Sequence, residues 1–75
     1  MKTKFQIYDI VRVTRLPDLP VKGERGSFRS ARVGDTGTVV MVYEEPSEGY
    51  TVEGVAGSGR TEWLGDFLPD DLEKV

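Results

Sequence analysis

Two absences restrict the chemistry open to this 75-residue chain, which contains neither cysteine nor histidine. Without these residues the chain has no thiol nucleophile, no imidazole general base and no zinc or haem site of the usual kind. Carboxylates, hydroxyls, lysines and arginines remain, and carboxylate oxygens suit Ca²⁺ or Mg²⁺. No spacing among these groups points to a reaction, so we expect a protein without enzymatic activity, metal ion or cofactor.

The stretch "GDTG" at 34–37 contains glycines that could cradle a phosphate. A phosphate-binding loop, however, has a longer glycine-rich run and leads into a helix. The residues that follow here are "TVVMVY", which are apolar and β-branched as in a strand. We therefore interpret Gly34 and Gly37 as structural glycines that shape the backbone at a turn.

Opposite charges are concentrated in the two parts of the sequence. Residues 1–32 carry eight basic and three acidic residues, net +5, whereas residues 33–75 carry two basic and ten acidic residues, net −8. The segment 15–33 has two prolines and no sustained period, which indicates a long loop. A basic loop with an aromatic ring can track a nucleic-acid backbone and stack a base, and it can also dock onto a protein. Its candidate contact residues are Arg15, Arg25, Phe28 and Arg29.

Acidic residues gather at a turn and near the C-terminus. They are Glu44, Glu45 and Glu48, followed by Asp66, Asp70 and Asp71. Their spacing does not match the Ca²⁺ loop of an EF-hand. They form either a solvated acidic face or a surface that attracts a basic partner.

Five aromatic residues have two possible roles: Tyr8, Tyr43, Tyr50, Trp63 and Phe67. Exposed rings can form a groove for proline-rich peptides, whereas a small core needs large side chains to fill it. We include Trp63 among the candidate binding residues and expect most of the other rings to pack in the core.

The pattern of apolar residues predicts a small all-β domain. Alternation and β-branched residues predict strands at about 8–14, 36–44, 50–56, 60–65 and 72–75, with the loop 15–33 after the first. Pro69 followed by Asp70 and Asp71 predicts a single helical turn before the last strand. Five short strands in one 75-residue domain are best accommodated by a small barrel.

The order "YDIVRVT", "VGDTGTVVMVY", "GYTVE" and "FLPDDLE" resembles SH3-like barrels of the KOW type. It is also similar to the electron-transport accessory group, which includes a small peripheral subunit of photosystem I and the barrel of the nitrile hydratase β subunit. It is most similar to free-standing bacterial proteins of this fold grouped as a domain of unknown function. The resemblance implies an SH3-like barrel that acts by docking, with Gly37 as the glycine of the motif and Val39 in the core.

Together these observations predict a docking protein that binds another protein through the basic loop and an adjoining face of the barrel. The alternatives are binding of RNA or the ribosome in the manner of KOW domains, and an accessory subunit of an electron-transport or enzyme complex. A net charge of −3 favours a protein partner over a nucleic acid. The chain has no apolar run long enough to span a membrane and no signal-peptide pattern, so we expect a cytoplasmic protein, as a monomer or a homodimer.

Overall fold

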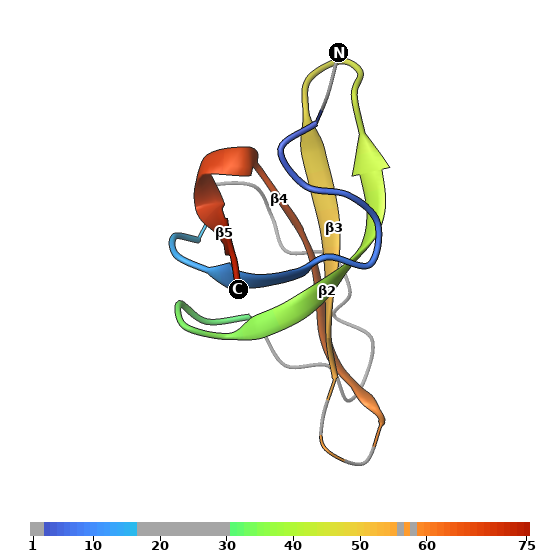
Figure 1. The fold of residues 1–75 in the computed structure, drawn as a ribbon. Helices are drawn as coiled ribbons and strands as arrows, with labels where there is room; N and C mark the ends of the chain where they lie inside the picture. Colours follow the sequence, from blue (N-terminus) through green and yellow to red (C-terminus); the bar gives the residue numbers. More distant parts are fainter. Residues whose placement is uncertain (1–2, 17–30, 56, 58) are drawn as a thin grey trace.

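The computed structural model of the chain describes residues 3–16, 31–55, 57 and 59–75. These residues form an antiparallel sheet of five strands with one short helical turn, so the predicted all-β, five-stranded fold is confirmed (Figure 1). The elements are β1 (Ile10–Val13), β2 (Thr36–Tyr43), β3 (Gly49–Val55), β4 (Thr61–Phe67), the 3₁₀ turn η1 (Pro69–Asp71) and β5 (Leu72–Lys74).

Two strand boundaries differ by two residues from those predicted by the sequence, and the other differences are of one residue. β1 begins at Ile10 and not at Tyr8, because the Asp9 side chain accepts the N–H of Gln6 at 2.9 Å and holds residues 6–9 in a turn. β4 continues to Phe67, since its last residues pair with Thr51 and Tyr50 of β3. Cross-strand pairing therefore extends the fourth strand beyond the local alternation that predicted 60–65.

The sheet must curl for the chain to connect its two ends. The strand order is β4-β3-β2-β1-β5, so β4 and β5 lie at opposite ends of the sheet. In a flat sheet these two strands would lie roughly 19 Å apart, whereas the connection through η1 spans only roughly 14 Å. Figure 1 shows η1 leading from β4 directly to β5 beside β1. The curl gives the sheet a concave side, which encloses the core.

One face of each strand supplies that core. The buried apolar residues are Phe5, Val11, Val13, Ala31, Val39, Tyr50, Val52, Trp63, Phe67 and Leu72. In β1 and β3 the buried positions alternate with more exposed ones, which is the period-2 pattern of a half-buried strand.

Trp63 is the largest of the core side chains and packs where two glycines leave space. A Cβ atom at Gly54 would lie 2.0 Å from the Trp63 ring, and one at Gly37 would lie 2.7 Å from the carbonyl oxygen of Glu53. The ladder between β3 and β4 also shifts register just after Gly54. Gly37 thus serves a close approach, whereas Gly34 has a φ of +97° and serves the turn before β2.

We predict that Gly54→Ala destabilises the protein by about 3 kcal/mol, because the new methyl group overlaps the Trp63 ring in a packed core. A core of this size provides roughly 3 to 5 kcal/mol of net stability, so the variant would be largely unfolded at 37 °C. Urea unfolding monitored by Trp63 fluorescence measures the change. Gly57→Ala is the matched control, since a Cβ there meets nothing within 4 Å, and equal stability of the two variants would contradict the prediction.

Candidate functional site

The N-terminal segment before β1 is fastened to the β2–β3 hairpin by a buried hydroxyl. The Tyr50 hydroxyl accepts the backbone N–H of Phe5 at 3.1 Å and donates to the Glu48 carboxylate. The same Glu48 oxygen accepts the N–H of Lys4 at 2.8 Å. The Phe5 ring meets the Tyr50 ring edge to face, with 5.2 Å between centroids. These contacts join residues 45 positions apart in the chain.

The contact between Tyr50 and Glu48 affects the pKa of both groups. The pKa of Glu48 is lowered, chiefly by the hydrogen bond from the Tyr50 hydroxyl and then by the N–H of Lys4. The pKa of Tyr50 is raised, first by burial and then by the Glu48 carboxylate that its hydroxyl bonds. At neutral pH the pair is therefore a carboxylate and a phenol, which is the arrangement that the hydrogen bond requires.

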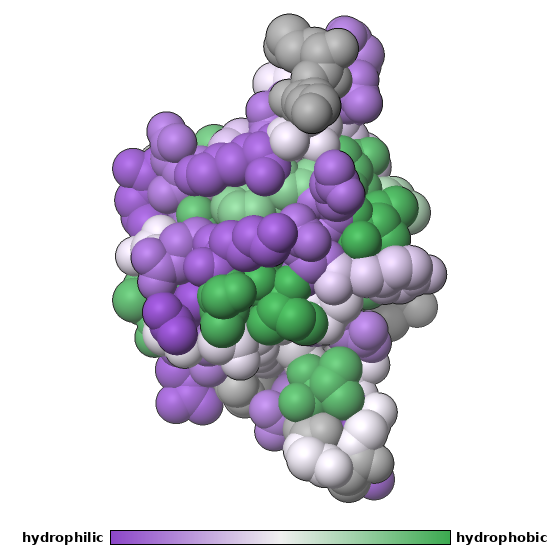
Figure 2. Space-filling view, in the orientation of Figure 1, coloured by the Kyte–Doolittle hydropathy of each residue, from purple (hydrophilic) through white to green (hydrophobic). Residues whose placement is uncertain are grey.

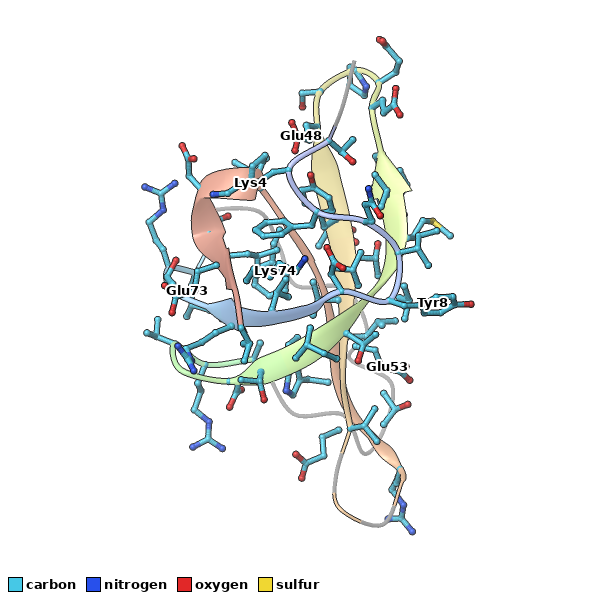
Figure 3. All side chains as sticks on the ribbon, viewed as in Figure 1. Lys4, Tyr8, Glu48, Glu53, Glu73 and Lys74 are labelled. Atoms are coloured by element: carbon cyan, nitrogen blue, oxygen red, sulfur yellow. The ribbon has the colours of Figure 1, made fainter. Side chains whose placement is uncertain are left out.

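Tyr8 is the residue of the N-terminal segment with the least ordinary geometry. Its φ is +76°, in the left-handed region that disfavours side chains larger than glycine. Its N–H donates to the carbonyl of Val39 at 2.7 Å, which keeps the segment beside β2. The side chain is 78% exposed, so its ring contributes little to the core. Figure 3 shows it pointing away from the sheet, on the same side as Glu53.

We use the name Tyr8 surface for four exposed apolar residues of the N-terminal segment, β1 and β3, namely Ile7, Tyr8, Ile10 and Val55. Each of these side chains is exposed by nearly half or more. Ile10 and Val55 line a shallow hollow of about 170 Å³ together with Glu53. Figure 2 shows hydrophobic side chains reaching this face of the molecule between polar ones. Apolar groups gathered at a surface, with a polar surround, are typical of an interaction site.

A second hollow lies between the β2–β3 turn and the end of β4. We call it the hairpin hollow; its volume is about 210 Å³. It is lined by Tyr43, Glu45, Pro46, Ser47, Glu48, Gly49, Tyr50, Asp66, Phe67 and Leu68. Three of the six acidic residues singled out in the sequence therefore meet there. Asp71, the last residue of η1, is buried and does not line the hollow.

Arg15 has a structural contact at the end of β1. Its Nε donates to Oδ1 of the buried Asp71 at 2.8 Å, while Oδ2 of Asp71 accepts the N–H of Leu68 at 3.0 Å. The Asp71 carbonyl also accepts the N–H of Thr14 at 2.8 Å. Arg15 is thus held at the junction of β1 and η1, and its guanidinium neutralises a carboxylate that would otherwise be costly to bury.

Of the other predicted binding residues, the structure describes only Trp63. Trp63 is 1% exposed and belongs to the core, because Gly37 and Gly54 make room for its ring on the concave side of the sheet. It therefore does not contribute to an exposed binding face. Arg25, Phe28 and Arg29 lie outside the described residues, as does most of the loop 15–33.

The sequence pattern did not indicate that Tyr8 is exposed, since its place in a β-branched run predicted a strand. The only signal was Asp9, a residue type that favours turns, three positions after Gln6. The hairpin hollow joins residues of two acidic groups that the sequence did identify, but their proximity follows from the pairing of β3 with β4.

No family model, curated protein or solved structure matches the chain. Within the described part of the chain, no helix is long and apolar enough to cross a membrane. The described residues also contain no group of three or more carboxylates positioned to hold a metal ion.

We predict that Glu48 gives the folded state a stability that is lost in acid. Its pKa is lower in the folded protein than the ordinary value of 4.5, so its contribution is present above that value and disappears as the pH falls through the lowered pKa. Glu48→Gln should therefore be less stable than the wild type at pH 7, and the difference should shrink below pH 4.5. Urea unfolding at a series of pH values measures both curves.

The control for this experiment is Glu44→Gln, which removes an exposed carboxylate on the same turn. Its curve should run parallel to that of the wild type. Parallel curves for the wild type and Glu48→Gln would show that Glu48 does not contribute in this way.

Proposed function

We propose that this protein is a non-enzymatic docking protein of the SH3-like barrel kind, which binds a partner protein in the cytoplasm through the Tyr8 surface. An accessory subunit of a larger complex is one form that such a protein takes. The observation that carries the proposal is Tyr8, which combines a left-handed backbone with an exposed ring.

The energetics of Tyr8 support a role outside folding. A left-handed backbone costs a bulky residue about 1 to 2 kcal/mol, and an exposed ring recovers little of this by burial. Backbone strain of this kind concentrates at functional positions, where the surrounding structure enforces it. Tyrosine is also a residue enriched at protein interfaces, since it supplies a large contact area at a low cost in conformational entropy.

The charge of the described residues favours a protein partner over a nucleic acid. They include eleven acidic and six basic residues. Three of the basic residues, Arg12, Arg15 and Lys74, lie within 4 Å of a carboxylate. A phosphate backbone needs an excess of basic side chains at its binding surface.

We predict that Tyr8→Asn and Tyr8→Ala have different effects on the free energy of unfolding. Both variants remove the ring, but only asparagine relieves the strain of the left-handed backbone. Asparagine tolerates the left-handed region, so Tyr8→Asn should raise the free energy of unfolding by about 0.5 to 1 kcal/mol. Alanine keeps the strain, so Tyr8→Ala should change it by less than about 0.5 kcal/mol. Urea unfolding measures both values, and a loss of more than about 1 kcal/mol in either variant would assign Tyr8 to folding.

Binding is tested with the same variants. Tagged wild-type protein is used to capture partners from an extract of the source organism, and the captured proteins are quantified by mass spectrometry. We expect Tyr8→Asn and Tyr8→Ala to lose the same partner. Val33→Asn is the control, because Val33 is an exposed apolar residue in the connection between β1 and β2 and is not part of the Tyr8 surface. This variant should retain the partner. Retention of the partner by both Tyr8 variants would refute docking through this surface.

A further inference from the structure

The hairpin hollow has the size and shape of a site for one side chain. Its volume of about 210 Å³ is below the roughly 300 to 1,000 Å³ of pockets that hold small molecules and cofactors. The hollow opens to solvent between the turn at 45–49 and the end of β4. An occupant would therefore enter as a projecting side chain of a larger molecule.

Apolar groups form the walls and floor of the hollow. Tyr43 and Leu68 are each 40% exposed, and Pro46 lies on the turn between β2 and β3. Phe67 and Tyr50 are buried and close the hollow from below. A ring, a proline and a leucine together suit the methylene stem of a long side chain, and the Tyr43 ring suits a planar cation.

Carboxylates supply the polar part of the lining. Glu45 makes no hydrogen bond or ion pair with any described residue, and Oδ1 of Asp66 accepts only the Thr51 hydroxyl, at 2.6 Å. Glu48 is held by the Tyr50 hydroxyl and by the N–H of Lys4, and its pKa is lowered, so it carries a negative charge at neutral pH. The hollow thus combines apolar walls with two carboxylates, Glu45 and Asp66, that form no ion pair with any described residue.

The charge of Lys4 helps to lower the pKa of Glu48, but the Lys4 ammonium forms no ion pair with a carboxylate of the hollow. Its Nζ donates to the carbonyl of Pro69 at 3.3 Å and lies 5.3 Å from the centroid of the Phe5 ring. A bound metal ion is also a poor fit, because no three carboxylates of the described residues are arranged to hold one. An extended organic cation is the occupant that matches both the volume and the charge.

We propose that the hairpin hollow binds a single arginine side chain from a basic segment of the partner protein. The proposal rests on the docking function above, because it specifies the chemistry of the partner. Arginine fits better than lysine because its planar guanidinium stacks on rings and bonds carboxylates in pairs, whereas the lysine ammonium is compact and strongly hydrated. Tyr43 and Pro46 provide the stacking surface, and Glu45 and Asp66 accept the N–H groups.

The test is a titration of ¹⁵N-labelled protein with a blocked peptide that carries one arginine between glycine and serine residues. We expect saturable shifts of the amide signals of Gly49 and Leu68, and an affinity that falls as NaCl is added. A peptide with citrulline, the neutral isostere of arginine, should bind about tenfold more weakly or not at all. Glu45→Gln and Asp66→Asn should each weaken binding of the arginine peptide by about two- to fivefold.

Glu44→Gln is the matched control, because this carboxylate lies beside the hollow in sequence but does not line it. It should leave the affinity unchanged. Asp66→Asn retains an oxygen that can accept the Thr51 hydroxyl, so its fold should be preserved, and the spectrum of the free variant checks this directly.

Three results would overturn the proposal: the absence of saturable shifts at the hollow, equal binding of the citrulline peptide, or equal losses in Glu44→Gln and the two lining variants. None of these would affect docking through the Tyr8 surface, which is measured by partner capture with the Tyr8 variants. Conversely, retention of the partner by those variants would remove the docking proposal while the peptide titration still reported on the hollow itself.

Discussion

The buried hydroxyl of Tyr50 is the contact on which both candidate surfaces depend. A hydroxyl in a core must be hydrogen-bonded, and this one is satisfied by the N–H of Phe5 and by the Glu48 carboxylate. Through Phe5 it holds the N-terminal segment that presents Tyr8. Through Glu48 it orders the turn that forms one wall of the hairpin hollow. A single buried side chain of β3 therefore positions two exposed regions that are far apart in the sequence.

Substitutions in the core are expected to be destabilising, because the Trp63 ring occupies space that exists only where two residues are glycine. Gly37 and Gly54 lie on neighbouring strands, and a Cβ atom at either would come within 3.0 Å of the Trp63 ring. The space left by the two glycines is filled by one indole, which a small domain uses to bury a large apolar area with few residues. The same arrangement removes Trp63 from the surface, so the exposed apolar groups are other residues, Tyr8 and its neighbours among them.

The basic and acidic parts of the sequence do not stay apart in the folded protein, because strand pairing brings several basic residues beside carboxylates. Arg12 is paired with Glu73 across the β1–β5 ladder, and Lys74 of β5 lies 3.8 Å from the carboxylate of Asp9, which directly precedes β1. Arg15 is likewise used by the buried Asp71. None of these three pairs uses a carboxylate of the hairpin hollow.

The amino-acid sequence by itself determined the fold class, the approximate strands and the helical turn at Pro69, because alternation, β-branching and turn residues act over a few neighbouring positions. It also indicated the turn at Gly34, whereas Gly37 lies within β2, and the close approach at this glycine depends on Trp63 of β4. The exposure of Tyr8, the burial of Trp63 and the convergence of Glu45 and Glu48 with Asp66 were decided only by the tertiary structure. Each of these features depends on contacts between segments that are distant in the chain. Such contacts follow from the pairing of the strands and the curl of the sheet, and a local sequence pattern encodes neither.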